Sequence, residues 1–387
     1  MNRRYLYVFG LLLATALMIT TVPASAQTHP GAPQASASWA FGPSSPFFGT
    51  RFDGAYIPSL NRVYFLGYRD ETNATNGSVW YLDLATQTYV DTGVDMPVPI
   101  SNYQIAPLKD SHGLGLYVFG GRDNNGAILT TVQAYYPAVN NAFVISSDPW
   151  PGTTPSACVS LPAMGVVTIK NHAIVMGGAS FSTSVPACVD DNSAQTWVFN
   201  PMGAPGTRWT QGPNLNLARG YITGAVLNGR VYAIGGDVNS AGTLFPQTTV
   251  EAWQPPTGGW NDAGVADLPE ACDESQAFPF TSGPAAGDIV LATCGQWPNV
   301  NGDTNIYDSA ANSWSLGGTV LDAVRNEAGE FIKVGSAVRM FILGGYELSQ
   351  AVTSNSEIGT PGPLSGAQGA FGTSRAPARP DHLPPTN

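Results

Sequence analysis

A short phrase recurs six times along the chain: a run of strand-forming residues followed by a pair of glycines. The clearest copy is VYAIGG at 231–236, and in two altered copies Tyr68 or Cys294 replaces one glycine. The marker positions of the six copies are Gly67, Gly120, Gly177, Gly235, Cys294 and Gly344. Successive markers lie 50 to 59 residues apart. A fixed period of this length indicates a repeat protein in which each copy forms one supersecondary unit.

Each repeat contains signals for four antiparallel strands. In the fourth repeat, a first strand at 221–227 meets Asn228-Gly229, which is a strong hairpin signal. The second strand ends in the glycine pair, a third carries an aromatic residue such as Trp253, and a fourth carries a tryptophan such as Trp260. The sequence therefore predicts one four-stranded sheet for each repeat.

The two ends of the repeat region complement each other. The WAFGP segment that begins at Trp39 resembles the fourth strands of other repeats, although no glycine pair precedes it. The last repeat has one further strand-like piece at 353–358 and no tryptophan strand. We expect the Trp39 strand to complete this last sheet and close the ring. The fold class is then all-β: a six-bladed β-propeller over residues 38–359, closed by an N-terminal strand that completes the last blade.

The glycine pair, the aromatic third strand and the tryptophan of the fourth strand resemble kelch repeats, as found in the galactose oxidase and kelch-like superfamily. The resemblance covers roughly residues 38–359 and implies the fold more strongly than the function. It also implies that the loops joining strands 2 and 3, and those leading from strand 4 to the next strand 1, share one face. We call this face the top face, and the face with the 1–2 and 3–4 turns the bottom face.

The flanking segments differ from the repeats in composition. Residues 1–26 read as a secretory signal, with Arg3 and Arg4, an apolar stretch and the small residues Ala24-Ser25-Ala26. Residues 27–37 form a polar leader, and residues 360–387 are rich in Pro, Gly and Ala and are predicted to be a disordered tail. No later apolar run is long enough for a membrane span. We therefore expect a secreted or periplasmic monomer.

The chain is poor in charge and acidic. Charged residues make up 11% of the sequence, and the formal net charge is −11. An acidic surface repels nucleic acid and anionic lipid, so neither is expected as a partner.

Cys158, Cys188, Cys272 and Cys294 are the cysteines of the chain. An even number in an exported protein favours disulfides over free thiols. In the register implied by kelch repeats, the pairs 158–188 and 272–294 each lie at the top of one blade. Four unpaired thiols remain the alternative, and a zinc site is disfavoured because no two cysteines are closely spaced.

Charged residues that the repeat register places at the top face are the candidate ligand-binding set. Arg51 and Arg219 each precede their marker residue by sixteen positions, and Arg325 occupies a similar place. Arginine forks could hold a carboxylate- or sulfate-bearing ligand, but pairing with neighbouring acids that pins the blades together is the favoured alternative. Trp297 could stack on a sugar or simply be an exposed aromatic residue. The full set is Arg51, Arg219, Arg325, Glu274, Arg122, Asp237 and Trp297.

The histidines argue against a hydrolytic or copper site. His112 and His172 fall in bottom turns of different blades, which makes a Ser-His-Asp triad improbable. Copper enzymes on this fold need paired histidines and a free cysteine, which this chain does not offer. Polar loops such as 123–126 lack the ligand spacing of calcium sites. No cofactor and no metal are expected.

We therefore predict a non-catalytic, exported kelch-repeat protein that binds a glycan or an extracellular protein through its top face. The alternative is a carbohydrate-active enzyme similar to the periplasmic sialic-acid epimerases (mutarotases), with Arg51, Arg219, Arg325 and Glu274 as its charged residues. The likeness to those enzymes is at the level of the fold.

Overall fold

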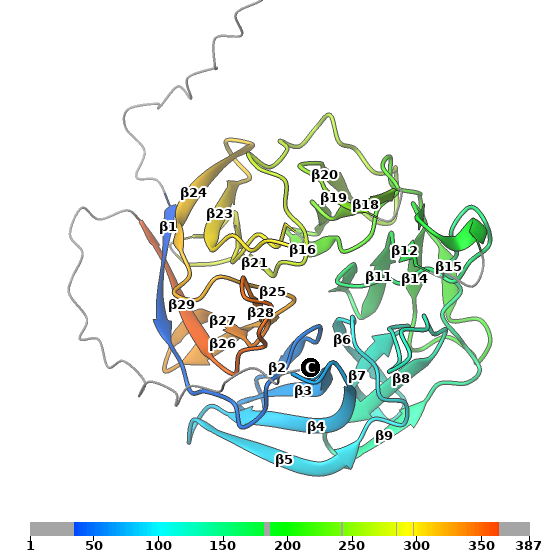
Figure 1. Ribbon diagram of the computed structural model, residues 1–387, viewed down its shortest axis with the longest axis horizontal. Coiled ribbons are helices and arrows are strands. Elements are labelled where there is room, and N and C mark those ends of the chain that lie inside the picture. The colour runs from blue at the N-terminus through cyan, green and yellow to red at the C-terminus, as the bar shows by residue number, and fades with distance from the viewer. Residues whose placement is uncertain (1–34, 182–185, 241–242, 284, 297, 364–387) are drawn as a thin grey trace, which may run out of the picture. The chain divides into compact units, whose positions relative to one another are not determined.

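The computed structural model describes residues 35–363 except 182–185, 241–242, 284 and 297. The predicted signal, most of the leader and the tail from 364 onward lie outside the described residues. Within them the protein is built from β-strands, with one short 3-10 helix, η1 (Pro186–Cys188), and no α-helix. Six sheets are arranged around a central axis (Figure 1). The part of the chain that is described contains no helix long and apolar enough to cross a membrane.

Blades one to three each contain four antiparallel strands. Blade one contains β2 (Gly54–Ile57), β3 (Arg62–Arg69), β4 (Thr75–Asp83) and β5 (Thr88–Asp95). Blade two contains β6 (Ile105–Asp110), β7 (Gly113–Phe119), β8 (Val132–Tyr136) and β9 (Asn141–Val144). Blade three contains β10 (Val166–Ile169), β11 (His172–Met176), β14 (Thr196–Phe199) and β15 (Trp209–Gln211).

Blades four to six complete the ring. Blade four contains β16 (Thr223–Leu227), β17 (Arg230–Ile234) and β20 (Val250–Trp253). Blade five contains β21 (Ala277–Pro279), β22 (Asp288–Leu291), β23 (Asp303–Asp308) and β24 (Ser313–Thr319). Blade six contains β26 (Ala328–Val334), β27 (Ala337–Leu343), β29 (Ser356–Pro363) and β1 (Ala35–Phe41).

Three small two-stranded sheets lie in the 2–3 loops and 4–1 loops. They are β12 (Ala179–Ser180) with β13 (Asp191–Asn192), β18 (Asp237–Ser240) with β19 (Thr243–Pro246), and β25 (Val324–Arg325) with β28 (Tyr346–Glu347). These small sheets give parts of the top-face loops a regular backbone pairing.

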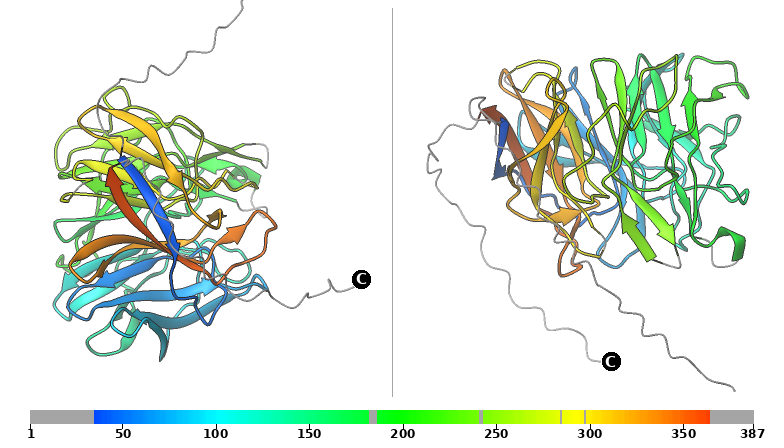
Figure 2. Two further views of the ribbon diagram at one scale, coloured as in Figure 1. Left: turned by 90° about the vertical axis from the view of Figure 1, so that its left-hand side faces the viewer. Right: turned by 90° about the horizontal axis from the view of Figure 1, so that it is seen from above.

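The ring closes as the sequence predicts. Strand β1 pairs antiparallel with β29, with Trp39 opposite Gly359, and Figure 2 shows the two strands side by side. The Trp39 indole donates to Thr304 Oγ1 of blade five at 3.1 Å. A Cβ at Gly359 would lie 2.8 Å from the Trp39 ring, so the register requires a small residue here. Strand β1 begins three residues before the expected start of the propeller at 38, and β29 ends at Pro363 rather than 359.

Blade four departs from the predicted pattern of four strands. The Trp260 segment forms only one isolated bridge, between Ala252 and Asn261. Trp260 itself is buried, and its indole donates to Thr196 Oγ1 of blade three at 3.0 Å. The tryptophan thus keeps its packing role even though the fourth strand is reduced to a single pair.

The innermost strands contact one another around the ring: β2, β6, β10, β16, β21 and β26 in turn. Polar side chains in these strands, or one residue before them, form hydrogen bonds with the backbone of the next blade. Asp53 accepts from Ile105 N at 2.9 Å, and Gln104 accepts from Val166 N at 3.0 Å. Gln276 donates to Glu327 O at 2.9 Å, while Glu330 accepts from Tyr56 N at 3.1 Å. Polar side chains in the wall of the channel therefore connect neighbouring blades.

The glycine pairs have a steric cause. Gly235 and Gly236 have φ values of 55° and 95°, a backbone region that favours glycine. A Cβ at Gly235 would collide with the carbonyl oxygen of Cys272, at the start of the next blade. Gly344 approaches the carbonyl oxygen of Gly49 in the same way. The repeated phrase therefore marks the points where one blade's second strand touches the next blade.

The two predicted cysteine pairs are confirmed. Cys158 and Cys188 are bonded with their Cα atoms 5.7 Å apart, and Cys272 and Cys294 with theirs 4.9 Å apart. Each bridge lies within one blade, and among the described residues no free cysteine remains.

Candidate functional site at the channel mouth

Six non-glycine residues with positive φ, one from each blade, occupy the same place just before the innermost strand. Their φ values lie between 48° and 61°. We call them the mouth ring: Arg51, Asn102, Met164, Tyr221, Glu274 and Asn326. Each lies two or three residues before the first residue of the inner strand of its blade, at the top of the channel.

Hydrogen bonds connect five of the six members of the mouth ring. Asn102 N donates to Arg51 O at 2.7 Å, Arg51 N to Asn326 O at 2.8 Å, and Asn326 N to Glu274 O at 3.1 Å. The amide of Asn102 donates to the Tyr221 hydroxyl at 3.3 Å, which joins blades two and four across the axis. Every ring member except Arg51 is buried. Arg51 is therefore the partly exposed member of the mouth ring.

Arg219 does not reach the mouth. Its side chain is fully buried inside blade four and pairs with Glu251 Oε1 at 2.5 Å. Nη1 also donates to Leu217 O, and Nε and Nη2 donate to the carbonyl oxygens of Gly235 and Ala233, at 2.6–3.1 Å. This buried arginine, with all three of its nitrogens hydrogen-bonded inside the blade, matches the structural alternative that we favoured from the sequence.

The alignment of Arg51 with Arg219 fails because turn lengths differ. Four residues separate β2 from β3, whereas two separate β16 from β17. A fixed count of sixteen residues back from the glycine pair therefore ends, in blade four, two residues before the position that corresponds to Arg51. The residue at that corresponding position is Tyr221. Arg325 also lies outside the mouth ring, one residue before Asn326.

Arg325 and Glu274 form a buried pair between blades six and five. Arg325 Nη1 lies 3.1 Å from Glu274 Oε2, and Nη2 donates to Gln350 Oε1 at 2.5 Å. The guanidinium also lies 4.7 Å from the centre of the Tyr346 ring. Both charges are thus occupied in holding the top of the channel together.

Arg51 has a different environment. Within the described part of the chain, no carboxylate lies within ion-pair distance of its guanidinium and its Nε has no hydrogen-bond partner. Its guanidinium lies 5.5 Å from the centre of the Tyr346 ring. Burial lowers the pKa of Arg51, but Tyr221, Glu274 and Tyr346 together outweigh it, so the pKa is raised and the side chain stays cationic.

Two further arginines lie beside Arg51. Arg69 is buried and donates to Ser101 Oγ at 3.1 Å, and its pKa is lowered by burial and by the charges of Arg51 and Arg122. Arg122 is partly exposed, donates to Gly126 O at 3.2 Å and lies 5.6 Å from the centre of the Phe181 ring. We call Arg51, Arg69 and Arg122 the basic arc. Arg69 was not among the residues that we expected at this site from the sequence. It directly follows a glycine-pair position, as Arg122 does, and this shared position could have identified it.

Acidic residues occupy the opposite side of the mouth. Asp237 is fully buried, and neither carboxylate oxygen has a hydrogen-bond partner among the described residues. Burial, and then Asp273 and Glu274, hold the pKa of Asp237 well above its usual value. Trp297, the remaining candidate, lies outside the described residues.

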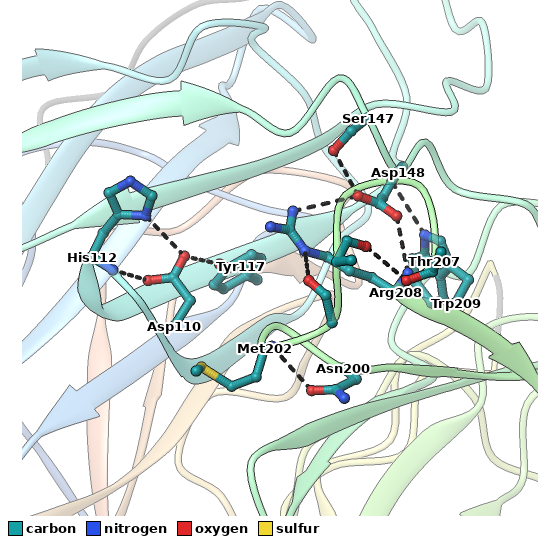
Figure 3. Close-up of polar contacts among 12 residues, drawn as sticks. Asp110, His112, Tyr117, Ser147, Asp148, Asn200, Met202, Thr207, Arg208 and Trp209 are labelled. Carbon is teal, nitrogen blue, oxygen red and sulfur yellow. Dashed lines mark hydrogen bonds and ion pairs between the residues drawn. The ribbon is translucent and has the colours of Figure 1, made fainter.

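A second polar concentration lies between blades two and three (Figure 3). The Asp110 carboxylate accepts from the Tyr117 hydroxyl and from His112 N, both at 2.7 Å. It also accepts from the Tyr136 hydroxyl at 2.7 Å. Nearby, the Asp148 carboxylate accepts from Ser147 and from Arg208. Burial raises the pKa of Asp148, but these hydrogen bonds outweigh it and the pKa is lowered. Both carboxylates are well satisfied, which is typical of structural groups.

In the described ranges, no three His, Cys, Asp or Glu side chains are placed to hold a metal ion together. At the top face, two guanidinium groups lie beside aromatic rings, Arg51 beside Tyr346 and Arg122 beside Phe181, and all four residues are partly exposed.

The chain is similar in sequence to two scruins and to an F-box/kelch-repeat protein. The chain is 23% identical over 218 residues to beta-scruin and 24% identical over 204 residues to alpha-scruin, both of Limulus polyphemus. These matches cover 54% and 51% of this chain but only 22% and 20% of the scruins. An F-box/kelch-repeat protein of Arabidopsis thaliana is 27% identical over 152 residues, which are 36% of this chain and 29% of that protein.

The fold has a counterpart among solved structures. A structure of YjhT superimposes with a TM-score of 0.57 and 16% identity, covering 81% of this chain and 95% of the other. No family model matches the sequence. With six blades, glycine pairs at the blade contacts and kelch-repeat relatives, the chain is a kelch-repeat β-propeller.

Proposed function

We propose that this propeller is a non-catalytic binding module whose top face binds the carboxylate groups of another protein. The observation that carries this proposal is the state of Arg51: a partly exposed residue at the mouth, with no carboxylate of the described residues within ion-pair distance of its guanidinium. Arg122 extends the cationic surface, and Arg69 supports it from below. Guanidinium groups bind carboxylates bidentately, and arginine and tyrosine are enriched at protein interfaces.

The burial of the mouth ring supports a macromolecular partner. A small ligand requires a concave pocket that buries most of its surface, and five of the six residues of the mouth ring are buried and so expose little side chain to a small molecule. A surface with cationic and aromatic groups fits a protein partner better. The enzyme alternative is weakened, because Arg219 and Arg325 are occupied in buried ion pairs.

The site of action that we propose is outside the cytoplasm. Two disulfides indicate an oxidising environment. Export through the apolar segment at 1–26 would place the protein there, and mass spectrometry of the mature amino terminus tests this step.

The binding proposal is tested with a fluorescein-labelled peptide library in which Glu and Asp content is varied, read by fluorescence anisotropy. We expect acidic peptides to bind, and Arg51→Ala and Arg122→Ala each to weaken binding about fivefold or more, as for partly exposed charge pairs. Arg230→Ala, on the bottom face, is the matched control and should bind normally. Binding of glucuronate but not of acidic peptides would favour a glycan ligand, and equal loss in Arg230→Ala would overturn the site.

A further inference from the structure

The bottom face concentrates cations in an otherwise acidic chain. All three lysines of the sequence, Lys109, Lys170 and Lys333, lie in or beside the turns that join first and second strands. Arg62 and Arg230 take the same place in blades one and four, whereas Asp110 in blade two and Asp288 in blade five are acids beside this turn. With a net charge of −11 for the whole chain, this distribution makes the bottom face the favoured approach for anions.

A cavity opens on this face between blades three and four. Its volume is about 680 Å³, within the range of small-molecule sites. Ile174 and Val198 of blade three form one apolar wall, and Trp253, Pro255 and Pro256 of blade four form the other. The cavity can therefore bury a flat or linear apolar body of metabolite size.

The charged groups that line this cavity are all cationic or basic. Lys170 and His172 line it, and no Asp or Glu does. Lys170 is exposed, and no carboxylate of the described residues lies within ion-pair distance of its ammonium group. A ligand with a negative charge would therefore meet a free cation and no repulsion at this rim.

The turn between the first and second strands of blade three fixes the backbone that carries Lys170 and His172. Lys170 and Asn171 have φ values of 47° and 60°, as in a tight hairpin turn. Asn171 bonds to Lys109 in blade two, accepting from its N at 2.7 Å and donating to its O at 2.9 Å. His172 Nδ1 lies 3.0 Å from Lys170 O. Since a carbonyl oxygen only accepts, Nδ1 carries the proton, and Nε2 of the neutral ring is an acceptor that offers no donor to a carboxylate.

We propose that this cavity binds an organic anion with an apolar body, namely an aliphatic or aromatic carboxylate. The carboxylate is held at the rim by Lys170, and the apolar body packs against Trp253 and the aliphatic wall. The site lies on the face opposite the mouth ring and is independent of the proposed top-face function.

The test uses octanoate as the anionic probe and octan-1-ol as the uncharged probe of equal chain length, with isothermal titration calorimetry on the full-length protein. We expect octanoate to bind about fivefold more tightly than octanol, since a single accessible ion pair contributes at most about a factor of five. Lys170→Gln should reduce octanoate affinity by about the same factor and leave octanol unchanged. Lys109→Gln, in the equivalent turn of blade two, is the matched control.

A cavity-filling variant locates the site independently of charge. Thr210 is an exposed residue of β15 that lines the cavity, so Thr210→Trp should fill it without touching the core. We expect this variant to lose binding of both probes while its thermal melting curve stays that of the parent protein. The proposal is overturned if octanoate does not bind, if both probes bind equally, if Lys109→Gln weakens binding as much as Lys170→Gln, or if Thr210→Trp binds normally.

Discussion

A buried guanidinium is stable only where carboxylate and carbonyl oxygens replace the water that it loses. Arg219 meets this condition through Glu251 and three backbone carbonyl groups. Glu251 in turn accepts from the backbone N of Asn216 and Leu217, so that the pair also fixes the chain leading into blade four. At the scale of single residues, this pair is the strongest local constraint on the top of the propeller.

Replacing Arg219 should therefore cost much stability and little binding. Arg219→Ala leaves the Glu251 carboxylate buried without its cation, and we expect the free energy of unfolding to fall by about 3–5 kcal/mol. Urea denaturation monitored by tryptophan fluorescence measures this change. The double variant Arg219→Met, Glu251→Leu should regain a large part of the loss. A loss below about 1 kcal/mol would show that the pair is not desolvated.

At the scale of strands, β1 depends on one side chain for its place in blade six. Trp39 is buried between β1 and blades five and six, whereas Phe41 on the same strand is 54% exposed. The strand reaches its position only after the rest of the last blade is present, because its backbone partner is β29.

Trp39→Ala should lower the free energy of unfolding by about 3–5 kcal/mol, as for other large buried aromatic residues. Phe41→Ala is the matched control on the same strand, with an expected change within about 0.5 kcal/mol. Differential scanning calorimetry compares the two. Similar values for both variants would mean that the strand is held by its backbone pairing alone.

Strands, turns and ring closure were predictable because glycine pairs, hairpin turns and aromatic positions act through the backbone and repeat in every blade. The cysteine pairs followed from the same register. The direction of individual arginine side chains was not predictable, because the 1–2 turns differ by two residues and shift Arg219 away from the position of Arg51. The missing fourth strand in blade four could not be seen either, since Trp260 keeps its packing role without the strand.

At the scale of the whole molecule, several carboxyl groups lie in the blade contacts with little solvent. Burial raises the pKa of Asp53 and of Glu357 to about 7, and that of Glu327 and of Glu330 to about 8. Each group binds its proton more tightly in the folded state than in the unfolded state. By linkage, the stability that they contribute is present below pH 4 to 5, where both states are protonated, and is lost as the pH rises towards 8.

The free energy of unfolding should therefore be larger at pH 5.5 than at pH 8.5. Urea denaturation at these two values measures the difference, and Glu330→Gln should reduce it because the amide cannot ionise. The glutamine carbonyl can still accept from Tyr56 N, so the blade contact is kept. Stability that rises between pH 5.5 and 8.5 would contradict the raised pKa values.

The pairing of β1 with β29 has a consequence for how the protein is made. Residues 35–41 leave the ribosome early, yet their partner at 356–363 is synthesised more than three hundred residues later. The toroid cannot be completed during synthesis of the first five blades, so the nascent chain must wait with one sheet unfinished. A chaperone that shields that waiting segment, or a circular permutant that places it directly after its partner, should speed maturation without changing the final architecture.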